Sequence, residues 1–407
     1  MKKTTLTGLL LIFAISVFAQ IPTMPSKSSD DQSSNNQVLT EYEMVVTKSF
    51  KPIEKIPLDK NALLIFDYDG VLKSLNTTTN KVNWEFKAKG EEVEHAWNKF
   101  TLEDGVLYVP FLNGEMYALN HKTGEKFWEL KMGVKNSRYV KSTVNQIPQI
   151  SGNQLFVTTQ YENSNIYSFD KRNGKLLWNY KLQYPYNHLP VLYFKDKVFT
   201  QNAPFVYSFD AKSGRALYQR GFKKAMYGKP VTDGTNVIIA DESRTVFALA
   251  PENLDIVWEY NIDDDHYAID EKILTKNGVV YFAAEANGES GGVYAIDSKT
   301  GKEIWKLFLP GDMASITEYN NKLYVTSKKG IFYRIDPKTG KDELTLPLTN
   351  IPISNFEFVD DNTAYFYCEA GLIKLNISSE KEELVYERNS IDEDADKVDE
   401  VYLKLVR

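Results

Sequence analysis

The chain has 407 residues with 48 Lys and Arg against 55 Asp and Glu, a formal charge of −7, and 43% hydrophobic residues, which is a folded rather than a disordered composition. Its single cysteine excludes a disulfide-built scaffold and a Cys-rich zinc module. The acidic balance argues against nucleic acid as the main partner, because proteins that neutralise phosphates concentrate Lys and Arg on a basic surface.

The first 19 residues have the pattern of a secretory signal peptide. Lys2 and Lys3 precede an apolar run from Gly8 to Ala19, and the compact Val17 and Ala19 favour cleavage after Ala19. The run is shorter than the roughly 17 to 25 residues of a membrane-spanning helix. No cysteine follows the cleavage site to carry a lipid anchor. We therefore expect an exported protein, periplasmic or secreted, with neither a membrane span nor a lipid anchor.

Residues 20–40 are expected to form a flexible linker. Their centre, residues 26–37, reads SKSSDDQSSNNQ and lacks any apolar periodicity. Residues 41–407 are then left as the folded domain.

A recurring unit occupies the chain from Asn61 to Tyr386. Each copy has an apolar strand, a polar turn, and a second strand with a large side chain four residues after the turn. The eight closing positions are Trp84, Trp128, Trp178, Tyr218, Trp258, Trp305, Leu344 and Leu384. Their mean spacing of about 43 residues is the period of a propeller blade. We predict an all-β fold, an eight-bladed β-propeller of four-stranded antiparallel blades. Seven blades are the alternative if the copy ending at Leu384 only closes the ring.

One copy carries a specific motif. The segment from Ala295 to Trp305 reads AIDSKTGKEIW and resembles the tryptophan-docking motif A-x-D-x-x-T-G-x-x-x-W of pyrroloquinoline-quinone-type (PQQ-type) propeller repeats. The segment from Ala118 to Trp128 departs from it by having Asn120 in place of Asp. The chain is therefore similar to the PQQ-like propeller family, which includes quinoprotein dehydrogenases and BamB-like envelope-assembly propellers. The resemblance implies the fold more than an activity.

The repeated tryptophans are expected to be structural. An indole on an outer strand packs between adjacent blades and donates its N–H there, where a single blade has no core of its own. The expected blade-docking residues are Trp84, Trp128, Trp178, Trp258 and Trp305.

Both ends of the folded domain carry strand-like segments, at Glu41–Phe50 and Val398–Val406. A propeller needs its ring closed, since open sheet edges invite association. We expect at least one of the two segments to complete the blade at the seam, and pairing of both in one sheet would tie the circle. Two frayed tails are the alternative.

No motif of a hydrolase, metalloprotease, nucleotide-binding loop or dinucleotide fold is present. Quinoprotein dehydrogenases carry a vicinal cysteine pair that a lone Cys368 cannot form, and Cys368 lies in a strand-like run that favours a buried, inert thiol. The run Asp263–Asp265 lacks the spacing of a calcium loop and is interpreted as an exposed acidic loop. We assign no catalytic, cofactor-binding or metal-binding residue. PQQ and calcium are possible cofactors without support.

Histidines and aromatic residues recur after the closing position of several copies, in the connection leading to the next blade. This connection should bring them to one mouth of the central channel, where they could stack on a ligand, or they pack loops instead. His121 lies in a hairpin turn and is expected at the surface. The candidate ligand-face residues are His95, Trp97, Tyr139, His188, Tyr227, His266 and Tyr267.

Together these features predict a monomeric, non-catalytic binding or scaffold propeller in the cell envelope. Its partner is expected to be an envelope protein or an extended ligand, and outer-membrane protein assembly is one role that the resemblance implies. The alternative is an enzyme, a quinone-dependent dehydrogenase, or a carbohydrate-binding or carbohydrate-active propeller that uses the channel mouth.

Overall fold

The structure is a computed structural model that describes residues 27–28, 43–67, 70–88, 99–111, 114–134, 147–159, 165–184, 187, 189–242, 244–262, 267–286, 290–311, 313–388 and 401–407. The expected signal peptide, most of the expected linker and the acidic run Asp263–Asp265 lie outside these residues.

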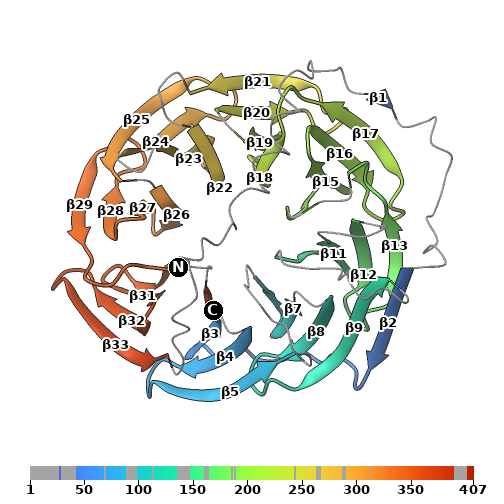
Figure 1. Cartoon of the computed structure of the whole chain (residues 1–407), viewed down its shortest axis with the longest axis horizontal. Coiled ribbons are helices and arrows are strands. Elements are labelled where there is room, and N and C mark those ends of the chain that lie inside the picture. The colour runs from blue at the N-terminus through green and yellow to red at the C-terminus, as the bar shows by residue number, and fades with distance from the viewer. Residues whose placement is uncertain are drawn as a thin grey trace, which may run out of the picture.

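Eight antiparallel sheets stand in a closed ring, with one strand of each on the rim (Figure 1). This confirms the predicted eight-bladed propeller. The described residues contain no helix, and so none that could cross a bilayer. From the inner to the outer strand, blade 1 consists of β34 (Tyr402–Leu405), β3 (Ala62–Phe66), β4 (Val71–Asn76) and β5 (Lys81–Lys87), and blade 2 consists of β6 (Thr101–Glu103), β7 (Val106–Pro110), β8 (Glu115–Asn120) and β9 (Lys126–Val134). Blade 3 consists of β10 (Gln149–Ser151), β11 (Gln154–Thr158), β12 (Ile166–Asp170) and β13 (Leu176–Tyr180), and blade 4 consists of β14 (Leu192–Phe194), β15 (Lys197–Asn202), β16 (Phe205–Asp210) and β17 (Ala216–Gly221).

The other half of the ring has the same order. Blade 5 consists of β18 (Met226–Thr232), β19 (Val237–Asp241), β20 (Thr245–Leu249) and β21 (Ile256–Asn261), and blade 6 consists of β22 (Tyr267–Lys276), β23 (Val279–Ala286), β24 (Ser290–Asp297) and β25 (Glu303–Pro310). Blade 7 consists of β26 (Met313–Tyr319), β27 (Lys322–Ser327), β28 (Ile331–Ile335) and β29 (Asp342–Pro347), and blade 8 consists of β30 (Glu357–Asp360), β31 (Thr363–Cys368), β32 (Gly371–Asn376) and β33 (Lys381–Glu387).

The two middle strands of each blade form the core. Every residue of β7 and of β19 is buried, because neighbouring blades cover both faces of the sheet. Such strands read as continuous apolar runs, whereas a strand with one wet face would alternate. The hydrophobic effect therefore acts between blades, and each blade depends on its two neighbours.

The C-terminal segment closes the ring. β34 pairs with β3, with Leu403 opposite Ile65 and Leu405 opposite Leu63. Blade 8 holds the same strand by side chains: Asn355 donates to the carbonyl of Leu403 at 3.0 Å and accepts from its N–H at 2.9 Å. The expectation that an end segment completes the seam blade is confirmed.

The N-terminal segment does not share that sheet, so one end and not both completes the blade at the seam. β2 (Glu43–Ser49) is instead a fifth strand on the outer edge of β9 in blade 2. Thr47 and Ser49 of β2 donate hydrogen bonds to the carbonyls of Gly174 and Asn173, in blade 3. The segment thus fastens blade 2 to blade 3. Within the expected linker, β1 (Lys27–Ser28) lies in the same way against β17.

Five blade junctions share one tryptophan geometry. Each indole Nε1 donates, over 2.7 to 2.9 Å, to a backbone carbonyl in the turn between the third and fourth strands of the following blade. The donor and acceptor pairs are Trp84 and His121, Trp128 and Lys171, Trp178 and Ala211, Trp258 and Ser298, and Trp305 and Pro337.

A glycine of the same turn lies under each of these indoles. The five glycines have φ between +69° and +73°, and an added Cβ would come within 2.5 to 2.9 Å of the indole ring. They are Gly124, Gly174, Gly214, Gly301 and Gly340. At the three junctions closed by Tyr218, Leu344 and Leu384, the turn position holds Leu254, Glu380 and Asn80, again at positive φ. Positive φ alone therefore does not require glycine at this turn position. Glycine is required where an indole lies over the turn and leaves no room for a Cβ.

Candidate binding surface

The structure describes little of the expected ligand face. His95, Trp97, Tyr139, His188 and His266 lie outside the described residues. The backbone of Tyr227 lies on β18 opposite Ala240, and that of Tyr267 lies on β22 opposite Glu285. β18 and β22 are neighbouring inner strands (Figure 1), so both positions lie on strands beside the channel. A shared ligand face for the seven residues remains a proposal.

Two clefts flank blade 7, at the turns that end its strands. The 6/7 cleft, of about 700 Å³, lies between blades 6 and 7, and the 7/8 cleft, of about 640 Å³, between blades 7 and 8. The hairpin residues Asn320 and Lys322 line both clefts. A surface with adjoining grooves between rigid blades suits an extended or protruding partner.

The 6/7 cleft has an apolar wall and a charged rim. Val279, Ile304 and Leu323 line it together with charged side chains, among them Lys338. Pro337 and Tyr281 also line it, and the carbonyl of Pro337 accepts from Trp305 Nε1 at 2.9 Å and from the Tyr281 hydroxyl at 3.2 Å. The blade junction that carries this cleft is therefore fixed by two side-chain donors before any partner binds.

The 7/8 cleft lies where the repeat departs from its motif. Other blades place a small residue opposite the closing tryptophan, as Ala295 lies opposite Trp305. Blade 7 has Arg334 opposite Leu344 instead. In blade 7, Arg334 thus stands where blade 6 has alanine, and Leu344 stands where blade 6 has tryptophan. The Arg334 side chain lines the 7/8 cleft. The substitution removes the indole from this junction and places a guanidinium beside the cleft, while Leu344 packs against the aromatic cluster of blades 7 and 8.

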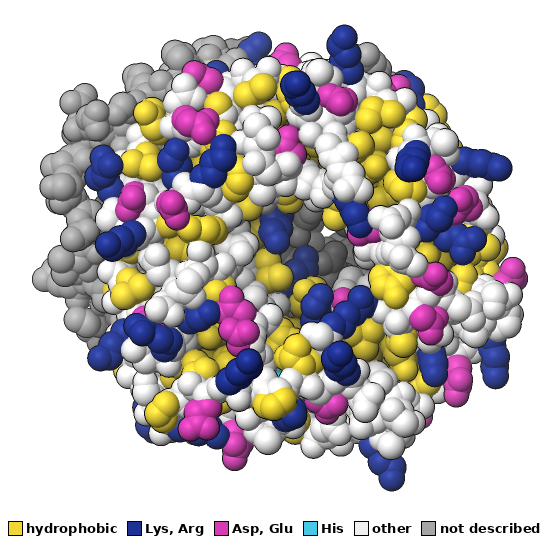
Figure 2. All heavy atoms as spheres, turned by 180° about the vertical axis from the view of Figure 1, so that it is seen from behind, with side chains coloured by type: hydrophobic (Ala, Val, Ile, Leu, Met, Phe, Trp, Pro, Cys, Tyr) yellow, Lys and Arg dark blue, Asp and Glu magenta, His cyan; other side chains and the backbone are white. Residues whose placement is uncertain are grey.

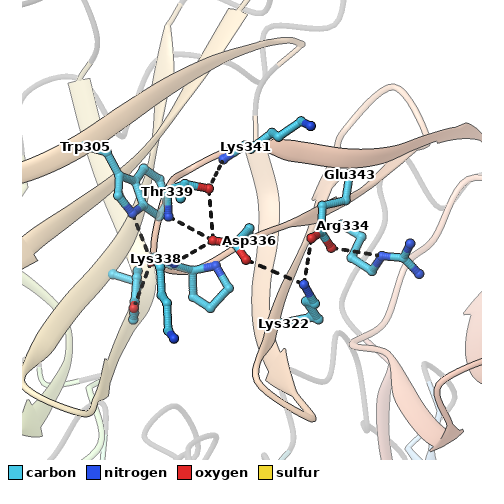
Figure 3. A network of polar contacts seen from close by, with 10 residues as sticks. Trp305, Lys322, Arg334, Asp336, Lys338, Thr339, Lys341 and Glu343 are labelled. Atoms are coloured by element: carbon cyan, nitrogen blue, oxygen red, sulfur yellow. Dashed lines mark hydrogen bonds and ion pairs between the residues drawn. The ribbon is translucent and has the colours of Figure 1, made fainter.

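Ion pairs hold the side chains between the two clefts (Figure 3). Lys322 Nζ lies 2.7 Å from Glu343 Oε1 and 3.6 Å from Asp336, and Arg334 Nε lies 3.5 Å from Glu343. The hydrogen bond to Glu343 raises the pKa of Lys322, and hydrogen bonds from Thr339 lower the pKa of Asp336. Lys322 and Asp336 are therefore charged at neutral pH, and the site pairs two basic with two acidic side chains.

The arrangement offers binding groups rather than reacting ones. Within the described residues, no three His, Cys, Asp or Glu side chains are grouped so that they could hold a metal ion. Cys368 is buried, as predicted, and burial raises the pKa of its thiol, which keeps it protonated and poorly nucleophilic. Seen from behind, the ring shows Lys, Arg, Asp and Glu interspersed around a central opening (Figure 2). No single sign of charge dominates this face.

His121 is buried, which corrects the prediction of a surface position. Its Nδ1–H donates to the carbonyl of Gly105 at 2.8 Å, and its Nε2 accepts from the backbone N–H of Asp59 at 3.1 Å. Burial lowers the pKa of His121, so the ring is neutral at neutral pH. The segment after β2 covers this hairpin turn, and the histidine binds that segment to blade 2.

Sequence reasoning missed Arg334 and the clefts beside it. A signal was present, because the residue opposite the closing position is Ala or Ser in six of the eight blades and Arg in blade 7. Recognising it requires the register of the third strand against the fourth, which is offset by a bulge at that point.

Known proteins with similar sequences include one family and two curated relatives. The model of the family described as outer membrane protein assembly factor BamB matches residues 44–260 and 269–343. The curated BamB of Shewanella oneidensis is 22% identical over 285 residues, which cover 67% of this chain and 68% of that protein. The 1-butanol dehydrogenase (quinone) of Thauera butanivorans is 27% identical over 162 residues, 39% of this chain, and the match spans only 24% of the dehydrogenase.

Solved structures share the architecture. BamB from Moraxella catarrhalis superposes with a TM-score of 0.59 over 81% of this chain and 97% of that chain, at 15% identity. At this level of identity the likeness concerns the fold alone.

Proposed function

We propose that this chain, which belongs to the family described as outer membrane protein assembly factor BamB, is a non-catalytic scaffold. It would bind an envelope protein during outer-membrane assembly. The family match over residues 44–260 and 269–343 carries the proposal, since it runs from β3 to β28 with a gap only at residues 261–268. The protein would act after export, in the periplasm or at the outer membrane, as the N-terminal segment suggests.

The binding surface we assign to this role is the pair of clefts around blade 7. Lys322 and Arg334 between the clefts are paired with Glu343, so a partner meets a surface on which these side chains have already lost conformational freedom. Preorganisation of this kind favours binding without requiring a large interface.

A capture experiment tests the proposal. Tagged full-length protein is incubated with solubilised outer-membrane extract, and bound proteins are identified by mass spectrometry. We expect recovery of an outer-membrane assembly protein in near-stoichiometric amount, and a loss of it in Lys338→Glu, since Lys338 lines the 6/7 cleft. Lys299→Glu is the matched control, because Lys299 has the equivalent turn position in blade 6 and lies outside both clefts. Equal recovery by the two variants would remove the clefts from the proposal, and no recovery at all would refute the function.

The match to a quinone dehydrogenase favours a second candidate, a quinone-dependent oxidoreductase. The lone, buried Cys368 argues against this candidate, because it cannot form the vicinal disulfide that is typical of quinoprotein dehydrogenases. Titration with PQQ and calcium separates the candidates, because a stoichiometric complex with a shifted absorption spectrum would favour the enzyme.

A further inference from the structure

The pairing of β2 with β9 shows what the rim of this propeller accepts. The outer edge of β9 carries seven register pairs with β2, from Ser49 opposite Trp128 to Glu43 opposite Val134. Beyond the pair, the N–H of Phe50 donates to the carbonyl of Phe127 at 2.9 Å. The outer edge of a blade is thus a template for an added antiparallel strand.

The residue before the closing aromatic reports whether a blade edge is covered. Five blades have a large apolar side chain there. Phe127, under the seven-residue β2, is 4% exposed, and Leu217 of blade 4, whose edge carries the two-residue β1, is half-buried. Leu177, Val257 and Ile304, on edges to which the described residues add no strand, are 49%, 50% and 48% exposed.

Charge distinguishes these edges from one another. On the covered edge, Lys51 beyond β2 forms a 2.6 Å ion pair with Glu125, three residues before Trp128, and Glu129 follows that tryptophan. When β25 is aligned on Trp305, the same two positions hold Lys302 and Lys306. Lys48 of β2 lies opposite Glu129 and Lys51 pairs with Glu125, so this N-terminal segment suits β9. Lysines at the two equivalent positions of β25 disfavour it there and suit an acidic segment instead.

β25 has two further features of a peptide site. It is the longest of the blade-edge strands that have no added strand among the described residues, with eight residues, and it exposes Phe308 at 45% as well as Ile304. Ile304 also lines the 6/7 cleft, which has room for a side chain beside it. Pro310 has no N–H to donate and ends the pairing edge.

We propose that the edge of β25 from Ile304 to Phe308 binds an extended acidic segment of an envelope protein as an added antiparallel strand. Backbone hydrogen bonds supply the pairing, acidic side chains meet Lys302 and Lys306, and an apolar side chain of the segment covers Ile304 in the 6/7 cleft. This inference rests on the proposed function, because it names the surface and the partner chemistry of that binding.

Two synthetic peptides test it. One has the sequence of residues 43–51, EMVVTKSFK, and the other carries Lys48→Glu and Lys51→Glu in that sequence. Fluorescence anisotropy measures the binding of each labelled peptide to the full-length protein. We expect the acidic peptide to bind at least tenfold more tightly than the basic one. Hydrogen exchange of Glu303–Pro310 should slow when the acidic peptide is bound, because the edge amides become paired.

Exchanging the charge of the edge should exchange the preference. In Lys302→Glu/Lys306→Glu the basic peptide should bind more tightly than the acidic one. Lys81→Glu/Lys87→Glu, on exposed lysines of β5, changes the net charge equally and should leave the preference as it is. The proposal would be overturned if neither peptide bound, or if the charge reversal left the order of the two affinities as it was. Unchanged hydrogen-exchange rates in Glu303–Pro310 would overturn it as well. If the extract still yields an assembly protein in that case, this inference fails while the proposed function stands.

Discussion

Replacing Gly214 by alanine tests why the turn glycines and the tryptophans occur together. Gly214 has φ +73°, and an added Cβ would be 2.5 Å from Cδ2 of Trp178. Two costs are therefore combined: a left-handed backbone conformation that alanine disfavours, and an overlap with a ring that cannot move. The ring is fixed because Trp178 is buried and donates to the carbonyl of Ala211 at 2.9 Å.

The two costs can be separated. The left-handed conformation costs an alanine about 1 to 2 kcal/mol, and overpacking of a filled site adds about 1 to 3 kcal/mol. Gly214→Ala should therefore lower the free energy of unfolding by roughly 2 to 5 kcal/mol. Gly234 is the matched control, because it has φ +88° and nothing within 4 Å of its added Cβ. Gly234→Ala should lower the free energy of unfolding by only about 1 to 2 kcal/mol.

A double-mutant cycle with Trp178→Leu completes the test. Without the indole, Gly214→Ala should cost only the conformational part, which leaves a coupling energy of about 1 to 3 kcal/mol between the two sites. Urea unfolding followed by far-ultraviolet circular dichroism measures all four proteins without depending on tryptophan fluorescence. Equal costs for Gly214→Ala and Gly234→Ala, together with no coupling to Trp178, would refute the steric explanation.

Three further predictions concern groups that hold the ring. Burial lowers the pKa of His121 from its ordinary value of 6.5, so the unfolded chain binds its proton more readily, and the free energy of unfolding should fall as the pH drops below that value. His121→Gln should remove this part of the pH dependence in urea titrations between about pH 8 and about pH 5, and an unchanged slope would contradict it. Asn355→Leu leaves the N–H and carbonyl of Leu403 without their side-chain partner, so stability should fall by about 2 kcal/mol and C-terminal proteolysis should quicken; wild-type resistance to protease would argue against it. Cys368 should react with an aromatic disulfide reagent only slowly in the native protein and quickly in urea, whereas rapid native reaction would contradict a buried thiol.

The architecture could be predicted from the sequence because the same strand-and-turn unit recurs eight times. The closing residues recur at the period of a blade, and the strand runs between them are apolar on both faces, as strands covered by neighbouring blades must be. Even the degenerate copy ending at Leu384 forms a full blade, β30 to β33. Its turn residue is Glu380, again at positive φ, and the closing residue of the preceding blade is Leu344 rather than a tryptophan.

What the sequence could not supply are contacts between distant segments. His121 resembles a surface turn residue locally, and it is buried because Asp59, 62 positions earlier, crosses above it. β2 has the pattern of a strand, but nothing in that pattern selects the rim of blade 2 over the seam. The selection depends on partners such as Glu125 and Gly174, which the repeat brings there only after folding.

The seam also affects the order of folding. β3, β4 and β5 come first among the blade strands, yet blade 1 lacks its inner strand until residues 402–405 pair with β3. Joining Leu63 to Leu405 closes a loop that contains the other seven blades, and such long-range contacts form slowly. The first blade in chain order is thus among the last to be completed, wherever in the cell the chain folds.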